Sequence, residues 1–240
     1  MEWFQRGHVA IVTGGSRGLG KALARCLLAK GLTVIIDGRD SERLERACRE
    51  LSDIGDAVAI AGDVADLHHV HALVAAAKKA GRLDLLVNNA STLGAVPLPA
   101  VTELDRQTFA ALFDVNVFAP IHLIAHALPL LERSEAGTIV NVTSDAAVEA
   151  YSLWGGYGAT KAALDHISRV LAVELDAGST RVLAFDPGDM NTDMHRDAIP
   201  GADPAKLRDP AESAQALLRA IAEMKERFER VRASDTLSTV

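Results

Sequence analysis

The chain has few cysteines and no excess of positive charge, and each of these two properties argues against a class of protein. Only two of the 240 residues are cysteines, Cys26 and Cys48, and neither belongs to a CxxC pair or a Cys/His cluster. The sequence therefore predicts no disulfide framework, a reduced intracellular setting, and two thiols that act as buried small hydrophobes. Lys and Arg total 25 against 32 for Asp and Glu, a formal net charge of −7, which argues against nucleic acid or an anionic membrane as the main partner.

Long hydrophobic runs are also missing. The first residues, MEWFQRGHVAIVTGG, lack the basic region, the long apolar run and the small-residue cleavage site of a signal peptide. No apolar stretch approaches the ~18 residues that a membrane span needs. Hydrophobic residues make up 49% and charged residues 24%, as in an ordinary globular protein. We therefore expect a soluble, cytoplasmic protein that folds as a single domain over residues 1–240.

Short β-branched runs alternate with longer helical runs rich in Ala and Leu. The predicted strands are residues 8–14, 33–39, 57–64, 83–90, 137–144 and 180–188, with a seventh at 227–233. The predicted helices are residues 20–31, 41–55 (capped by Ser41), 67–81, 104–131 (bent at Pro120), 151–176 and 211–228. Strands that are apolar throughout and alternate with helices are typical of βαβ units with a covered parallel sheet. The fold class predicted is α/β: a doubly wound (Rossmann) parallel sheet of six to seven strands with helices on both faces. Residues 191–209, polar and proline-containing, are predicted to form a substrate flap.

A glycine-rich turn, VTGGSRGLG at 12–20, joins the first strand to the first helix. Glycines there let backbone amides approach a ligand closely, at a helix N-terminus that favours phosphate. The spacing is Gly-x-x-x-Gly-x-Gly rather than Gly-x-Gly-x-x-Gly, and such a turn can also be purely structural. Its place at the carboxyl end of a parallel strand favours a dinucleotide site.

The end of the second strand bears on which dinucleotide binds. An acidic residue that holds the ribose 2′-hydroxyl selects NAD, whereas arginine accommodates the 2′-phosphate of NADP. Asp37 and Arg39 are both candidates, and Arg17 in the glycine-rich turn is able to converge with Arg39 on one phosphate. The alternative leaves both arginines as solvated surface residues.

Aromatic residues make up only 4% of the chain, and one of its two tyrosines, Tyr157, stands four residues before Lys161. Residues at this spacing share a helix face, so the ammonium group is expected to lower the pKa of the phenol. A phenol tuned in this way can exchange a proton with an alcohol or carbonyl oxygen during hydride transfer. Ser144, at the end of the fifth strand, is able to bond the same oxygen, and Asn116 is a polar residue inside a helix. Each has a plain structural explanation alone, but the four together with the glycine-rich turn indicate a catalytic site.

Seven short segments together resemble the motif series of the short-chain dehydrogenases/reductases, in their compact single-domain branch. The segments are TGGSRGLG (13–20), GDV (62–64), NNA (88–90), Asn116, Ser144, YGATK (157–161) and PGDMNT (187–192). The resemblance runs from about Val9 to Thr192 and implies an oxidoreductase that acts on a small carbonyl or alcohol substrate.

The resemblance also implies a role for each matching residue. Tyr157 would be the acid/base, Lys161 would lower its pKa and contact the nicotinamide ribose, and Ser144 would polarise the substrate oxygen. Asn116 would hold a helix distortion and a water that links Lys161 to solvent. The implied cofactor contacts are Gly14, Ser16, Arg17, Gly18, Leu19, Gly20, Arg39, Asp63, Val64, Asn89, Ala90, Tyr157, Lys161, Pro187, Gly188, Met190 and Thr192. Gly38 stands where the family places its NAD-selecting acid, which favours NADP(H) over NAD(H), with Asp37 next door as the opposing observation.

The sequence departs from the family pattern at several positions. Ser91 replaces a glycine beside the cofactor, which implies a shifted backbone, and Asp145 and Asp189 fall near the expected substrate. The His68, His69 and His71 cluster lacks a supporting carboxylate pattern, so we interpret it as helix surface and expect no metal. The residues expected to reach the substrate pocket are Leu93, Leu153, Trp154, Met194 and His195.

Two other functions stay open besides the dehydrogenase. One is a catalytically silent nucleotide sensor or scaffold of the same fold, although such proteins usually lose the tyrosine or lysine. The other is a 3-oxoacyl-thioester reductase, which would need a basic surface near the pocket. Wide apolar faces on residues 104–131 and 151–176 further predict a homodimer or homotetramer.

Overall fold

Seven parallel strands form one sheet in the order β3-β2-β1-β4-β5-β6-β7. We describe a computed structural model for residues 5–175 and 180–237. The strands are β1 (Val9–Val12), β2 (Thr33–Gly38), β3 (Ala57–Ala61), β4 (Leu85–Asn88), β5 (Thr138–Val142), β6 (Arg181–Asp186) and β7 (Phe228–Arg232). The strand order reverses between β1 and β4, and a crevice opens at their carboxyl ends. The predicted doubly wound α/β sheet is confirmed, and the seventh strand forms.

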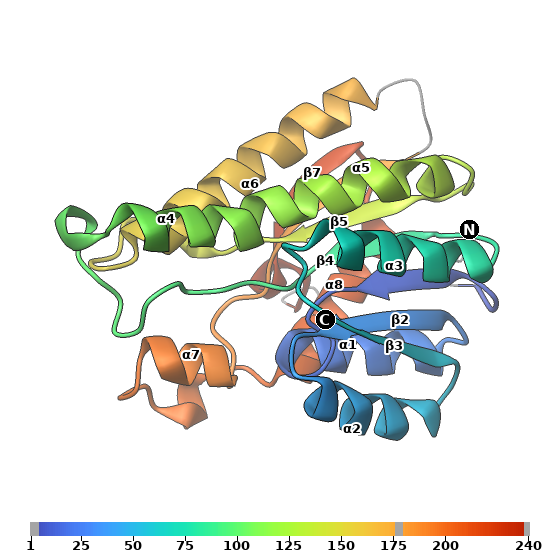
Figure 1. Cartoon of the computed structure of the whole chain (residues 1–240), viewed down its shortest axis with the longest axis horizontal. Helices are drawn as coiled ribbons and strands as arrows, with labels where there is room; N and C mark the ends of the chain where they lie inside the picture. The colour runs from blue at the N-terminus through green and yellow to red at the C-terminus, as the bar shows by residue number, and fades with distance from the viewer. Residues whose placement is uncertain (1–4, 176–179, 238–240) are drawn as a thin grey trace.

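Helices cover both faces of the sheet (Figure 1). One layer contains α1 (Gly18–Ala29), α2 (Ser41–Ser52) and α8 (Pro210–Glu223), and the other contains α3 (Leu67–Lys79), α5 (Ala119–Leu131) and α6 (Gly155–Glu174). Successive strand residues point to opposite layers: Ala10 and Val12 belong to the first core, and Val9 and Ile11 to the second. This explains why the central strands carry continuous apolar runs, such as VAIV in β1, instead of alternating apolar and polar residues. Cys26 and Cys48 are half-buried at the edge of the first core rather than fully buried.

Element ends differ from the sequence-based bounds by a few residues. Asp40, not Ser41, caps α2, because its side chain accepts a hydrogen bond from the Arg43 amide at 3.0 Å. The helix predicted over 151–176 begins only at Gly155, and its predicted last residue, Asp176, lies outside the described residues. The predicted strands extend too far, because residues such as 62–64 and 89–90 leave the sheet to line the crevice.

The helix predicted over 104–131 is divided into α4 (Arg106–Phe113), a π-helical segment (Asp114–Phe118) and α5. Its irregularity thus lies before Pro120, which occupies the first turn of α5, where a missing amide costs little. By length and composition alone the run Arg106–Leu131 would suffice to cross a membrane, contrary to the sequence-based expectation. The inward side of its α5 part packs into the second core.

The segment 191–209 contains the short helix α7 (Asp193–Ala198) and one turn of 3₁₀ helix (Pro204–Lys206). α7 stands apart from the two helix layers, beyond the carboxyl ends of β1 and β2 (Figure 1). The Met190 backbone pairs with Arg208, so the two ends of the segment are tied together. A last short helix, α9 (Ala233–Leu237), follows β7.

Candidate active site

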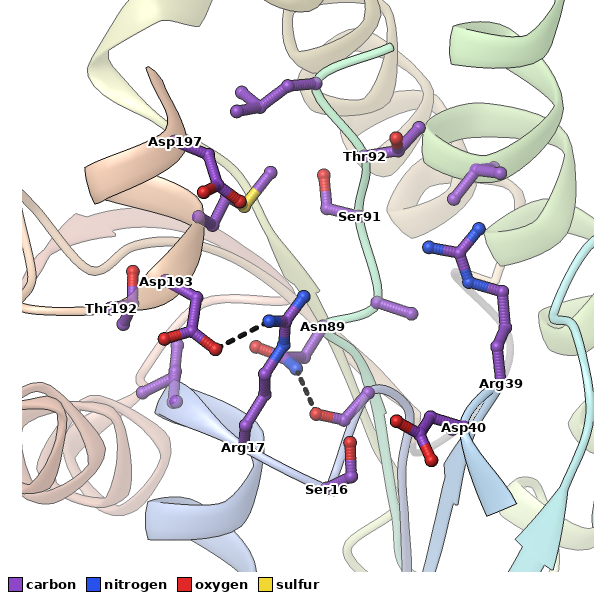
Figure 2. Close-up of a pocket in the computed structure, with 18 of the residues that line it drawn as sticks. Ser16, Arg17, Arg39, Asp40, Asn89, Ser91, Thr92, Thr192, Asp193 and Asp197 are labelled. Carbon is purple, nitrogen blue, oxygen red and sulfur yellow. Dashed lines mark hydrogen bonds and ion pairs between the residues drawn. The ribbon is translucent and has the colours of Figure 1, made fainter. Parts of the chain in front are cut away.

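A cavity of about 660 Å³ opens at the carboxyl ends of β1, β2 and β4 (Figure 2). Most of the residues predicted to contact a cofactor line it: Gly14, Ser16, Arg17, Gly18, Leu19, Arg39, Asp63, Val64, Asn89, Ala90, Met190 and Thr192. Leu93 and Met194 from the predicted substrate pocket also line it. Gly20, Tyr157, Lys161, Pro187 and Gly188 are not among its wall residues.

The glycine-rich turn needs its glycines because of how tightly it folds. Gly14 and Gly18 have φ values of +66° and +52°, a region that other residues rarely adopt. A Cβ on Gly20 would lie 2.4 Å from the Gly14 carbonyl oxygen. The first turn of α1 carries no carboxylate, so its positive end faces the cavity uncompensated. The geometry therefore fits a phosphate-bearing ligand.

Asp37 lines the cavity, but its carboxylate is bonded within the protein. Its side chain is 1% exposed, and its two oxygens accept the Gly14 amide at 2.6 Å and bond His69 Nε2 at 2.9 Å. Asp37 thus holds the glycine-rich turn and, with its oxygens occupied, is poorly placed as an NAD-selecting acid. The interpretation of all three α3 histidines as surface residues is wrong for His69, which is buried against Gly62, where a Cβ would lie 2.2 Å from its Nδ1.

Arg17, Arg39 and Arg43, three of the four arginines that line the cavity, have different surroundings. Arg17 bonds Asp193 of α7 at 2.6 Å instead of converging with Arg39, which stands on the other side of the cavity (Figure 2). Arg39, Arg43 and Ser16 all line the cavity. The Ser16 hydroxyl lies close to Gly38, where an added Cβ would be 3.2 Å from it. Asp40 lies between Arg39 and Arg43 in the sequence and pairs with Arg43 at 3.6 Å, which leaves Arg39 as the arginine at the end of β2 that a phosphate could pair with.

Asn89 and Ala90 are fixed by the end of β1. Their backbone amides donate to Thr13 Oγ1 at 2.9 and 3.0 Å, and Asn89 Nδ2 donates to the Thr13 carbonyl at 2.8 Å. Sequence reasoning missed Thr13, which joins β4 to the glycine-rich turn. Asp63 accepts the Ala65 amide at 3.0 Å and keeps its carboxylate at the cavity wall.

Tyr157 and Lys161 share a face of α6, as predicted from their spacing. Lys161 Nζ lies 5.5 Å from the centroid of the Tyr157 ring and donates to the Val142 carbonyl at 2.8 Å. Burial lowers the pKa of Lys161 from 10.5 to about 8. Burial also raises the pKa of Tyr157, so the expected lowering is wrong for the protein without ligand. The phenol is thus held in its protonated form at neutral pH.

The lowered pKa of Lys161 predicts a pH-dependent stability. Below pH 8 Lys161 is protonated in both the folded and the unfolded state, and the burial of its ammonium group destabilises the folded state. Between about pH 8 and 10.5 the folded state has lost this proton, whereas the unfolded state retains it. Stability from this group therefore rises with pH, by up to about 3 kcal/mol. We expect urea unfolding from pH 7 to 10 to show that the free energy of unfolding of the wild type rises relative to that of Lys161→Met. A difference in this free energy that stays constant with pH would contradict the effect of burial.

Ser144 and Asn116 are each fixed by hydrogen bonds to other parts of the chain. Ser144 Oγ donates to Asp145 Oδ1 at 2.9 Å and accepts the Ala146 amide at 3.2 Å. Asn116 lies in the π-helical segment, so the implied helix distortion is present. Its Nδ2 donates to the Thr92 carbonyl at 2.9 Å and to Thr160 Oγ1 at 3.0 Å, which ties the loop after β4 to α6.

Ser91 links the cavity to the tyrosine, a role that sequence reasoning missed. Its hydroxyl donates to Asn116 Oδ1 at 3.0 Å. Its proximity to Tyr157 lowers the pKa of the phenol, against the larger effect of burial, which raises it. Ser91 also lines the cavity and points into it (Figure 2). A serine in place of the family glycine was the only signal in the sequence.

The remaining predicted residues come from three segments: the residues after β6, the start of α6, and α7. The Pro187 carbonyl accepts Ser213 Oγ at 2.9 Å, and Gly188 has a φ of +70°. The Trp154 ring meets Tyr157 edge to face at 5.6 Å, whereas Leu153 is exposed. His195 faces Asp189 at 3.6 Å. Within residues 5–175 and 180–237, no three His, Cys, Asp or Glu side chains gather in a way that could hold a metal ion.

Comparisons with known proteins agree with this geometry. Residues 8–202 match the family model of the short chain dehydrogenases. An uncharacterised oxidoreductase of Staphylococcus saprophyticus is 34% identical over 217 residues, 89% of this chain and 90% of that protein. Benzil reductase ((S)-benzoin forming) of Saccharomyces cerevisiae is 34% identical over 199 residues, 80% of this chain and 74% of that protein.

The fold is shared with solved structures as well. A structure of a short chain dehydrogenase from Shigella flexneri, complexed with NADP, matches at a TM-score of 0.88 and 27% identity, and covers 98% of this chain and 100% of that one. The family resemblance of the motifs is thereby confirmed. The chain belongs to the short-chain dehydrogenase/reductase family of oxidoreductases.

Proposed function

We propose that this protein is a cytoplasmic enzyme that transfers a hydride between NADP(H) and a small carbonyl or alcohol substrate, with Tyr157 as acid/base. The main support is one arrangement: Lys161 Nζ lies 5.5 Å from the Tyr157 ring on one face of α6, and Ser91, at the wall of the cavity, is close enough to the phenol to affect its pKa. A nicotinamide bound in the cavity would supply or accept the hydride.

Each member of the catalytic set has a task suited to its surroundings. The protonated Tyr157 phenol donates a proton to a carbonyl oxygen, which favours reduction at neutral pH. Lys161 offsets negative charge on the phenolate that remains. Ser144 exchanges its bond to Asp145 for one to the substrate oxygen. Asn116 keeps the Ser91 loop against α6.

Turnover tests this function against its alternative, a silent nucleotide sensor. We expect NADPH oxidation with one or more members of a panel of ketones and aldehydes. Benzil belongs in the panel, because a relative at 34% identity is a benzil reductase. NADPH binding without oxidation of cofactor across the panel would instead favour the sensor. Both Tyr157 and Lys161 are present, which supports the enzyme.

The residues at the end of β2 support NADP(H) over NAD(H). Asp37 is occupied by Gly14 and His69, and Arg39 and Arg43 line the wall. Replacing Arg39 with Ala should weaken NADPH binding about 10- to 100-fold and leave NADH binding within about threefold, because charge-assisted bonds to a phosphate are strong. Fluorescence titration with each cofactor checks this. Equal losses for both cofactors would remove Arg39 from the 2′-phosphate site.

Exposed apolar side chains on the α4–α6 layer support a homodimer or homotetramer. Phe109, Phe118, Val170 and Val173 are 38%, 48%, 41% and 73% exposed. Large apolar groups gathered on one face usually mark an interface. We expect a solution mass of two or four times 25.4 kDa. A mass of one chain at micromolar concentration would contradict this assembly.

A further inference from the structure

The end of β5 that carries Ser144 is held by two cations from different parts of the fold. Lys161 of α6 donates from Nζ to the Val142 carbonyl at 2.8 Å. Arg230 of β7 donates to the Ser144 carbonyl at 2.9 Å. The Val142 and Ser144 carbonyls, two residues apart, thus accept hydrogen bonds from an ammonium and a guanidinium group, respectively. Only the first of these cations belongs to the motif series.

Arg230 is built into the interior rather than placed on the surface. Its side chain is 17% exposed, and β7 carries it into register with Ala184 of β6. Its Nε donates to Asp165 Oδ2 at 2.7 Å, and its terminal nitrogen lies 3.9 Å from Asp186 Oδ2. The planar fork of arginine can bond a carboxylate and a carbonyl at once, which a lysine cannot reproduce.

Asp165 supplies the countercharge that a buried guanidinium needs. It lies one helical turn after Lys161 on α6, and its side chain is 9% exposed. Its other oxygen, Oδ1, is buried and has no hydrogen-bond partner among the described residues. Arg230 is therefore the hydrogen-bonding partner of the carboxylate, and removal of Arg230 alone would leave a buried charge with only the electrostatic attraction of Lys161 to offset it.

We propose that Arg230 is a positioning residue for Ser144: its bond to the Ser144 carbonyl fixes the strand end that presents the Ser144 hydroxyl to the substrate oxygen. The inference rests on the proposed function, in which Ser144 contacts substrate. The competing explanation is that Arg230 only fastens β7 to α6. The two explanations predict different activities for a variant that lacks the charges of both Arg230 and Asp165.

The principal variant is the double substitution Arg230→Met with Asp165→Asn, which removes both charges and so limits the loss of stability. Asp165→Asn alone keeps the Arg230 bond to Ser144. Arg232→Gln is the matched control, because Arg232 lies on the same strand and approaches Asp186 at 3.7 Å and Glu149 at 3.6 Å. Arg230→Lys keeps the charge but cannot make both bonds.

We expect the double variant to lower kcat at least about tenfold while the Kd for NADPH stays within about twofold, since only the substrate side is displaced. Arg230→Lys should lower kcat at least about fivefold, and Asp165→Asn and Arg232→Gln should stay within about threefold of wild type. Wild-type kcat in a folded double variant, or in Arg230→Lys, would overturn the proposal.

Hydrogen exchange gives a readout that does not depend on activity. The Ala147 amide donates to the same Ser144 carbonyl at 3.1 Å, so it reports directly on that strand end. Its exchange should quicken at least about tenfold in the double variant, but not in the two controls. Unchanged exchange would overturn the proposal. A wild type that turns over no carbonyl would refute the proposed function and leave this measurement of Arg230 standing.

Discussion

Replacing Tyr157 with Phe should lower kcat about 1000-fold and leave the Kd for NADPH within about threefold, because only the proton donor is lost. The ring that remains still packs edge to face on Trp154, 5.6 Å away, so the site should keep its shape. NADPH oxidation with the best carbonyl substrate measures kcat, and fluorescence titration measures cofactor binding.

The other tyrosine provides a matched control. The Tyr151 hydroxyl donates to Asp145 Oδ2 at 2.9 Å, and its side chain is exposed. Tyr151→Phe removes the same atom from the same residue type, six positions away, and should leave kcat within about threefold. If Tyr157→Phe kept the activity of Tyr151→Phe, the assignment of the acid/base would be wrong.

Replacing Gly20 with Ala should abolish measurable cofactor binding, with a Kd at least about 100-fold higher. The added Cβ would meet the Gly14 carbonyl at 2.4 Å and Asn89 Nδ2 at 2.6 Å. Neither neighbour is free to move, because both belong to the bonds that join β1, β4 and the glycine-rich turn. The turn itself must shift, which displaces the amides at the N-terminus of α1 from the phosphate.

Gly81→Ala separates this effect from a general loss of stability. Gly81 has a φ of +87°, so an alanine there is strained, and it lies at the end of α3 before β4, away from the carboxyl ends of the strands. Both variants should be less stable than wild type, but only Gly20→Ala should lose NADPH. Equal cofactor affinity in the two would contradict the close packing of the turn.

The sheet and the glycine-rich turn could be predicted because they depend on local patterns. Apolar strands, helical spacing and glycines at a strand–helix junction can each be recognised within a short stretch of the sequence. The alternation of β2 also shows why Asp37 is buried: Ile35 belongs to the second core, and a residue two positions on faces the same side. The candidate NAD-selecting acid could have been assigned to the interior from this pattern alone.

Contacts between distant segments could not be predicted from the sequence. His69 is buried because β2 places Asp37 beside it, 32 residues away. Arg230 reaches Asp165 across 65 residues and Ser144 across 86. The raised pKa of Tyr157 has the same origin, since burial depends on everything packed around the phenol and the four-residue spacing to Lys161 reports only one neighbour.

A structure with NADP bound tests the central claim most directly, that the Tyr157 phenol exchanges a proton beside the reactive face of a nicotinamide. We expect the adenosine end beside Arg39, the pyrophosphate at the N-terminus of α1, and the nicotinamide in front of the Tyr157 and Ser144 hydroxyls. A nicotinamide turned away from Tyr157, or a nucleotide bound outside the cavity, would contradict it.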